Sequence, residues 1–270
     1  MSKFKFYEVG GKIRDEFLGL SSKDVDYVVV PSEELLNEDI HYVLGLLYEY
    51  LRDEGFKIFL CTEKCFTIRA QFPNRCDGCS GNHNIGLCAR MPCEKYSNKW
   101  NDYCGVADFV LARKEIGYIK GTRTPICVPG NLYDDLSRRD FTVNAIAKDI
   151  ITGEYIDFFN GIQDIKDMTL RTPLDPVKTF DDDPLRILRG IRFAITKNFN
   201  IDSKVSLAII QYDYSKMSVV SEERIREELF KCFKYNTLQT IYYLTEKYFD
   251  LWHYINTYTK IWLKPTIEKQ

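Results

Sequence analysis

The N-terminal segment carries a hydrophobic pattern that predicts strand, turn, helix and strand in that order. Apolar side chains in residues 4–9 predict a short strand, and Gly10 and Gly11 predict a turn in which no side chain blocks approach to the backbone. Residues 12–18 place two apolar side chains four positions apart, as in a helix, and a glycine then predicts its end. The valine-rich run 27–30 predicts a second strand.

Later segments predict further strands and an amphipathic helix. Residues 65–72 and 106–113 are apolar enough to form strands. Residues 221–233 predict a helix with one apolar face made of Ile225, Leu229, Cys232 and Phe233. The aromatic side chains near the C-terminus either complete a helical core or form an exposed stripe that would suit a partner: Tyr242, Tyr243, Tyr248, Phe249, Trp252, Tyr254, Tyr258 and Trp262.

Length and composition indicate an ordinary globular protein. The 270 residues can bury a full core in one or two domains, and 45% of them are hydrophobic and 28% charged. A net charge of -2 gives no overall basic character, so a nucleic acid would be held by local patches. No apolar run reaches the roughly 18 residues of a membrane span, and the N-terminus has no signal-peptide pattern. We therefore expect a cytoplasmic protein whose nine cysteines are thiols or metal ligands.

The glycine turn is a candidate anion site. A helix N-terminus offers free N–H groups and the positive end of a dipole, and Gly10 and Gly11 leave both accessible. Arg14 adds a fixed charge in the first turn of the predicted helix. A pair of glycines also occurs in turns that bind nothing, so this segment alone supports both interpretations.

Two aspartates lie just ahead of the valine-rich strand. Side chains on a strand alternate, so Asp24 and Asp26 point to one side with Cα atoms roughly 6–7 Å apart. Such a pair suits two Mg²⁺ ions about 3.5–4 Å apart, the geometry of in-line phosphoryl displacement. A solvated strand end is the alternative. The nearby glycine turn favours metal binding, because one part would hold a triphosphate and the other the metals that activate it.

Five segments resemble, in order, the motifs of one enzyme family. GGKIRDEFLG followed by SKDVDYVVV is similar to the first motif of the class II tRNA nucleotidyltransferases, the CCA-adding enzymes. Bacterial-type poly(A) polymerases share this motif, and both groups belong to the polymerase-beta superfamily. The other four segments are residues 138–147, 155–172, 181–194 and 220–229.

The resemblance implies an α+β fold in two parts. Residues 1–160 would form a nucleotidyltransferase palm domain, a mixed sheet with flanking helices, and residues 161–270 a helical neck that recognises the nucleotide. Residues 65–72 and 106–113 are expected to be neighbouring strands of the palm. The Cys-rich insertion 73–104 between them departs from the family pattern.

The resemblance also implies a third metal-binding carboxylate. Asp108 lies at the start of an apolar run before Arg113, where family members carry an acidic residue. With Asp24 and Asp26 it would hold two Mg²⁺ ions, one lowering the pKa of the RNA 3′-hydroxyl and one steadying the leaving pyrophosphate. Arg113 would contact phosphate or pack across the sheet.

The second motif would contact the nucleoside, while Gly10, Gly11 and Arg14 hold the triphosphate. The resemblance implies that Arg139 and Asp140 read the ribose. Asp140 would bind a hydroxyl, and Asn144 would support the same loop. Without the family context, Arg139 and Asp140 would equally suit a surface salt bridge.

The fourth motif carries the expected base selection. An aspartate, Asp182 or Asp183, can cap a helix that has Pro184 at its first position. Asp183 and Arg186 would then be neighbours on one face, with Arg189 one turn further on. A carboxylate only accepts hydrogen bonds and a guanidinium only donates, which matches the amino group and ring nitrogen of adenine and cytosine. Guanine and uracil would leave buried groups unpaired, at about 1–3 kcal/mol each. Family members usually carry Glu-Asp where this chain has Asp-Asp, which leaves the base-reading Asp183 in place.

The insertion holds a candidate zinc site. It is polar and contains three glycines, so it cannot build a core of its own, and a metal would order it. Four thiolates at suitable spacing predict structural zinc, and the alternative is free thiols on a loop: Cys76, Cys79, Cys88 and Cys93.

These features predict an Mg²⁺-dependent enzyme that adds CMP and AMP from CTP and ATP to an RNA 3′ end, and CCA addition to tRNA is the favoured activity. The rival activity is a poly(A) polymerase that uses ATP only. An inactive RNA-binding subunit is an alternative of another class, and the intact pair of aspartates argues against it. The expected partners are tRNA and nucleoside triphosphates, with no membrane. Either RNA binding is weak, or a partner chain or a homodimer completes it.

Overall fold

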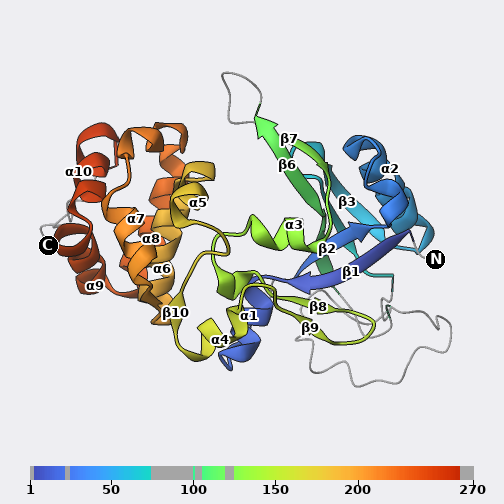
Figure 1. Ribbon diagram of the computed structural model, residues 1–270, viewed down its shortest axis with the longest axis horizontal. Helices are drawn as coiled ribbons and strands as arrows, with labels where there is room; N and C mark the ends of the chain where they lie inside the picture. The colour runs from blue at the N-terminus through green and yellow to red at the C-terminus, as the bar shows by residue number, and fades with distance from the viewer. Residues whose placement is uncertain (1–2, 22–24, 74–99, 101–104, 119–124, 262–270) are drawn as a thin grey trace, which may run out of the picture. The chain divides into compact units, whose positions relative to one another are not determined.

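The computed structural model describes residues 3–21, 25–73, 100, 105–118 and 125–261 (Figure 1). The chain divides into two compact units, each with its own core. The first unit comprises residues 1–137 and 144–162, and the second comprises residues 138–143 and 163–270. The segment 138–143, which the sequence assigns to the first domain, therefore packs with the second unit.

A seven-stranded mixed sheet forms the first unit, in the order β3-β4-β5-β2-β1-β8-β9 (Figure 1). β2 and β5 are parallel, whereas the other neighbours are antiparallel. β4 pairs with β5, as the sequence predicted for residues 65–72 and 106–113. The strands are β1 (Phe4–Val9), β2 (Asp26–Pro31), β3 (Lys57–Thr62), β4 (Thr67–Gln71), β5 (Val106–Leu111), β8 (Ala147–Asp149) and β9 (Tyr155–Ile156).

Helices cover the two faces of this sheet because its strands alternate apolar side chains. Phe6 and Val29 point to the face that packs on helix α2 (Ile40–Asp53). Val9 and Val28 point to the opposite face, where they pack with Leu132 and Leu136 of helix α3 (Leu132–Ser137). Asp26 shares the parity of Val28 along β2 and therefore lies on the α3 face.

Three further elements of the first unit flank the sheet. Helix α1 (Gly11–Phe17) follows β1 directly, and the strands β6 (Arg113–Tyr118) and β7 (Pro125–Pro129) pair as a separate antiparallel ribbon. Short 3-10 turns join other elements, namely η1 (Glu33–Leu35), η2 (Glu63–Cys65) and η3 (Thr142–Asn144). Because α1 begins at Gly11, the predicted strand, glycine turn and helix are confirmed.

The second unit is mainly helical. Two short parallel strands, β10 (Thr169–Leu170) and β11 (Asn200–Ile201), accompany its helices. Helix α4 (Gly161–Lys166) leads into it. The remaining helices are α5 (Pro176–Asp182), α6 (Leu185–Lys197), α7 (Ser203–Ile210), the 3-10 helix η4 (Tyr214–Val219), α8 (Glu222–Tyr235), α9 (Thr237–Tyr242), the π-helix η5 (Tyr243–Lys247) and α10 (Phe249–Tyr258).

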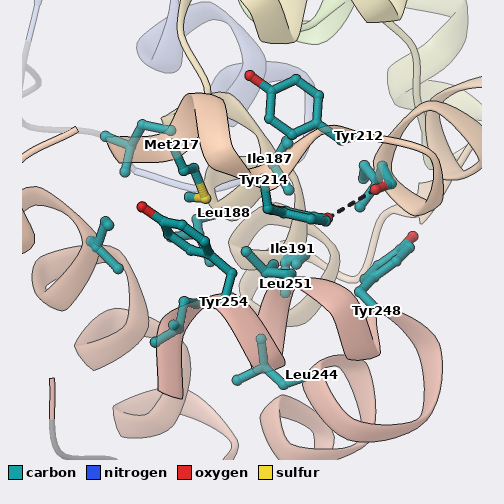
Figure 2. Close-up of a cluster of buried hydrophobic side chains, with 14 of the residues drawn as sticks. Ile187, Leu188, Ile191, Tyr212, Tyr214, Met217, Leu244, Tyr248, Leu251 and Tyr254 are labelled. Atoms are coloured by element: carbon teal, nitrogen blue, oxygen red, sulfur yellow. Dashed lines mark hydrogen bonds between the residues drawn. The ribbon is translucent and has the colours of Figure 1, made fainter. Parts of the chain in front are cut away.

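Figure 2 shows the core of the second unit, where aliphatic side chains of α6 meet aromatic rings of the later helices. The buried Tyr214 hydroxyl donates a hydrogen bond to the Ile209 carbonyl at 2.8 Å, and burial raises the pKa of that hydroxyl. Of the C-terminal aromatic residues, Tyr248 and Tyr254 are buried in this core, whereas Tyr242 is exposed. The aromatic segment thus supplies both core and surface, and Trp262 lies outside the described residues.

The predicted amphipathic helix is α8. Ser221 precedes it, and the Ser221 hydroxyl accepts a hydrogen bond from the Arg224 N–H at 3.4 Å. Ile225, Leu229 and Cys232 are buried against α6 and its neighbours. Burial raises the pKa of the Cys232 thiol to about 12, which keeps it a neutral, apolar side chain.

Candidate functional site

The glycine turn of the first unit leads directly from β1 into helix α1. Gly10 has a φ of 81°, a conformation that side chains disfavour, and it stands at the N-terminus of α1. No side chain of the described part of the chain caps this helix. A Cβ at Gly11 would meet the Arg14 guanidinium at 3.4 Å. Gly10 therefore supplies the conformation of the turn, and the Arg14 guanidinium lies beside Gly11.

Arg14 is buried rather than displayed to solvent. Its Nη1 donates to the Asn144 side-chain oxygen at 2.7 Å, and its Nε and Nη2 donate to Asp15 Oδ1 at 2.9 and 2.8 Å. Only 6% of Arg14 is exposed. The structure thus brings together Arg14 and Asn144, two predicted site residues from different motifs, and shows that each holds the other in place.

Two predicted metal ligands meet across neighbouring strands. Asp26 on β2 and Asp108 on β5 are directly opposite in the parallel register. Paired residues point to the same face of a sheet, so both carboxylates lie on the α3 face. The Arg69 guanidinium stands 3.6 Å from the Asp108 carboxylate. Asp24, the remaining predicted ligand, lies outside the described residues.

Arg113 packs across the sheet, which is one of its two predicted roles. Its Nη1 donates to the Cys65 carbonyl at 3.0 Å, and the guanidinium lies 5.7 Å from the centre of the Phe66 ring. These contacts join the start of β6 to the turn before β4. Arg113 therefore has a structural role at this turn.

In the second unit, Asp140 and Arg189 form a partly buried ion pair. Arg189 Nε and Nη2 approach Asp140 Oδ2 at 2.8 and 2.7 Å, and the Phe141 N–H donates to Asp140 Oδ1 at 2.8 Å. Burial acts to lower the pKa of Arg189, but the charge and hydrogen bonds of Asp140 outweigh it and raise that pKa. Arg139, the other predicted ribose contact, is partly buried beside Asp140 in sequence.

The start of the fourth motif differs from the prediction. Helix α6 begins at Leu185, with Pro184 before it rather than at its first position. Asp183 is extended, with φ of -148°, because a residue before proline disfavours the helical region. Its Oδ1 accepts a hydrogen bond from the Leu185 N–H at 3.2 Å. The carboxylate still caps the helix, but from one residue further out.

Asp183 and Arg186, the two predicted base-reading side chains, have separate hydrogen-bond partners. Arg224 of α8 donates to Asp183 Oδ2 at 3.2 Å. Arg186 donates to the carbonyls of Thr179 and Arg138 at 3.2 and 2.6 Å. The predicted Asp-plus-Arg pair is therefore two side chains held independently, one by α8 and one by backbone carbonyls.

Sequence reasoning missed a buried carboxylate of the third motif. Asp164 is 2% exposed, and its Oδ2 accepts from the Thr142 hydroxyl at 2.6 Å. Arg171 forms an ion pair with the same carboxylate. This contact ties the second motif to the third within the second unit. The spacing of seven positions between Asp164 and Arg171 was the one feature of the sequence that could have indicated this ion pair.

The candidate zinc ligands belong to the insertion 73–104. Cys76, Cys79, Cys88 and Cys93 all lie outside the described residues. Within the ranges that the structure describes, no three His, Cys, Asp or Glu side chains gather closely enough to hold a metal ion.

In the same ranges, no helix is long and apolar enough to span a bilayer.

Comparisons with known proteins identify one family. Residues 92–171 match the Poly A polymerase head domain. The CCA-adding enzyme of Lactococcus lactis is 41% identical over 222 residues, which cover 82% of this chain and 45% of that protein. The mitochondrial CCA tRNA nucleotidyltransferase of Saccharomyces cerevisiae is 35% identical over 229 residues, which cover 82% of this chain and 37% of that protein. The chain thus spans less than half the length of both relatives.

A solved structure shares the fold. The Bacillus stearothermophilus CCA-adding enzyme in complex with CTP superposes with a TM-score of 0.64 at 23% identity. The match covers 90% of this chain and 48% of that enzyme. This likeness supports the mixed α+β architecture.

Proposed function

Because this chain belongs to the nucleotidyltransferase family of CCA-adding enzymes and poly(A) polymerases, we propose that it adds CMP and AMP from CTP and ATP to the 3′ end of tRNA. The reaction joins the RNA 3′-oxygen to the α-phosphorus of the nucleotide and releases pyrophosphate. The name of the Saccharomyces cerevisiae relative supports tRNA as the acceptor, and the name of the Lactococcus lactis relative supports CCA addition.

The observation that carries this proposal is the pairing of Asp26 with Asp108. Their register puts two carboxylates side by side on one face of the sheet, with Asp26 exposed and Asp108 partly exposed. Hard oxygen ligands at a solvent-accessible edge fit Mg²⁺, which keeps several water ligands. We propose that Asp24 joins them. Such ions would activate the 3′-hydroxyl and neutralise the charge of the leaving pyrophosphate.

The glycine turn would bind the triphosphate through backbone N–H groups. Gly10 and Gly11 lie at the end of β1, whose Val9 is the register partner of Asp26. Phosphate oxygens at the turn would therefore be one strand away from the carboxylates. The hydrogen bonds of Arg14 to Asn144 and Asp15 hold its guanidinium beside this turn.

The second unit would select the nucleoside. Asp183 is fixed at both oxygens, by the Leu185 N–H and by Arg224, and a carboxylate oxygen can accept more than one hydrogen bond. The Asp183 carboxylate would accept a hydrogen bond from the amino group of cytosine or adenine. Arg186, oriented by the Thr179 and Arg138 carbonyls, would donate to the ring nitrogen. Asp140, with Arg139 and Arg189, would bind the ribose.

A direct assay tests this proposal. Purified protein with Mg²⁺ and tRNA that lacks its 3′ end is incubated with each labelled nucleoside triphosphate in turn. We expect incorporation of C and A and rejection of G and U. Extension with ATP alone would indicate the poly(A) activity, and tRNA binding without any incorporation would indicate an inactive RNA-binding subunit.

A further inference from the structure

A row of directly paired residues crosses the sheet from the candidate metal site to strand β3. Asp26 is opposite Asp108, Asp108 is opposite Arg69 on β4, and Arg69 is opposite Leu60 on β3. Directly paired residues share a face, so these four side chains lie on the α3 face. Neighbouring strands are about 4.8 Å apart, which places Leu60 about 10 Å from Asp108.

The outer end of this row is cationic and apolar. Among the described strands β3 lies at the edge of the sheet. Its register with β4 shifts between Ile58 and Leu60, so that Phe59 is the extra residue of a bulge. Phe59 is 51% exposed and Leu60 is 55% exposed. The Lys57 ammonium lies 5.5 Å from the centre of the Phe59 ring. We call Lys57, Phe59, Leu60 and Arg69 the β3–β4 edge surface.

Core packing on the α3 face is concentrated away from this edge. The buried cluster under α3 is built from β1, β2 and β8 together with Leu132 and Leu136. On β4, by contrast, Thr67 and Gln71 remain partly exposed beside the exposed Arg69. Exposed apolar side chains next to cations on an open sheet edge mark an interaction surface.

Arg69 is held only weakly by its acidic neighbour. The ion pair with Asp108 spans 3.6 Å, and the Arg69 side chain is 56% exposed. Exposed ion pairs of this kind contribute little to stability. A guanidinium forms stronger, bidentate hydrogen bonds with a phosphate. Arg69 can therefore exchange its ion pair with Asp108 for contacts with an RNA phosphodiester, without a loss of folding stability.

The position of this surface identifies which substrate it faces. Asp26 and Asp108 lie between β1, which leads to the glycine turn, and β4, which carries Arg69. In phosphoryl transfer the attacking and leaving oxygens are in line on opposite sides of the phosphorus. With the pyrophosphate at the glycine turn, the attacking 3′-oxygen comes from the β4 side.

We propose that the β3–β4 edge surface binds the single-stranded 3′ end of the acceptor RNA. Arg69 and Lys57 contact its phosphates, and Phe59 stacks on a base one or two nucleotides from the 3′-hydroxyl. Cations that follow the backbone and aromatic rings that stack on bases are the usual elements of single-strand binding. This proposal rests on the function proposed above, which sets the side from which the hydroxyl attacks.

The test measures binding of a fluorescein-labelled twelve-nucleotide single-stranded RNA by anisotropy, with CTP binding measured on the same preparations. We expect Arg69→Ala and Phe59→Ala each to weaken RNA binding at least about fivefold. Arg69→Ala should also reduce the slope of log affinity against log salt by about one, and Arg69→Lys should restore it. CTP affinity should stay within about twofold of wild type, because the glycine turn lies on the other side of the carboxylates.

Matched controls come from the opposite face of the sheet. Arg52→Ala and Tyr42→Ala remove an exposed cation and an exposed aromatic ring from α2. They should leave RNA affinity unchanged. Wild-type RNA affinity in both edge variants, or an equal loss in the α2 variants, would overturn the proposal. Since these are binding measurements, they decide it even for a chain that shows no transfer activity.

Discussion

Asp26 and Asp108 are direct partners in the parallel register of β2 and β5, although they come from distant parts of the chain. Two carboxylates so placed repel each other unless a cation lies between or beside them. Arg69 supplies one positive charge at 3.6 Å from Asp108. This strand pairing is the geometry on which the proposed metal site rests.

Removing either carboxylate should stop transfer while the protein still folds. We expect Asp26→Asn and Asp108→Asn each to lower turnover at least about a hundredfold, since metal activation contributes several kcal/mol. Binding of Mn²⁺, followed by its paramagnetic resonance signal, should weaken in parallel. Asp53→Asn is the control, because Asp53 is an exposed carboxylate on α2. Near-normal turnover in either site variant would remove that residue from the metal site.

Asn144 should be needed for stability and for nucleotide affinity. Asn144→Ala leaves the buried Arg14 without the acceptor that now stands at 2.7 Å. A lost partner of a buried charged group costs about 1–3 kcal/mol, measurable as a lower urea midpoint. The KM for CTP should rise, because the glycine turn rests on Arg14. Asn144→Asp keeps an acceptor oxygen and should preserve most of the stability; an equal loss in both variants would contradict the role of this hydrogen bond.

Base discrimination should depend on Asp183 and, to a smaller degree, on Arg224. Asp183→Ala removes the acceptor for the amino group, so use of UTP and GTP relative to CTP and ATP should rise about tenfold to a hundredfold. Arg224→Ala should relax selection less, because the Leu185 N–H still holds the carboxylate. Competition among equal concentrations of the four triphosphates measures both effects. Arg226→Ala, on the exposed side of α8, is the matched control. Unchanged selection in Asp183→Ala would place base recognition elsewhere.

Much of the local structure could be predicted from the chain itself. The period of apolar residues gave β1, α1 and α8 close to their observed bounds. The position of Asp108 before Arg113, read with the family pattern, pointed to a carboxylate on another strand. These predictions succeeded because they depend on neighbouring residues or on a motif.

Contacts between distant residues could not be predicted in the same way. The bond between Arg14 and Asn144 spans 130 positions, and that between Arg224 and Asp183 spans 41. Neither leaves a periodic signal in the sequence. The shifted start of α6 has a local cause, since the residue before Pro184 is extended, but the sequence equally allowed Pro184 inside the helix.

The second unit should lose stability in acid through Glu228. Burial alone would raise the pKa of Glu228, but the charges of Arg192 and Lys231 outweigh it and lower that pKa. A folded pKa below the unfolded value of about 4.3 adds stability above that pH, and the stability is lost as pH falls through the folded pKa. The free energy of unfolding of wild type should therefore exceed that of Glu228→Gln at pH 7 and approach it in acid. A difference that does not shrink in acid would show that the charge of Glu228 is not the cause.

The most direct test of the account is the 3′ sequence of the product RNA. The protein is incubated with Mg²⁺, all four nucleoside triphosphates and a tRNA transcript that ends before its CCA, and the products are sequenced. We predict that the added nucleotides read C, C and A, and that Asp108→Asn yields no extended product. Extension by A alone, by G or U as readily as by C, or at an undiminished rate in Asp108→Asn would contradict it.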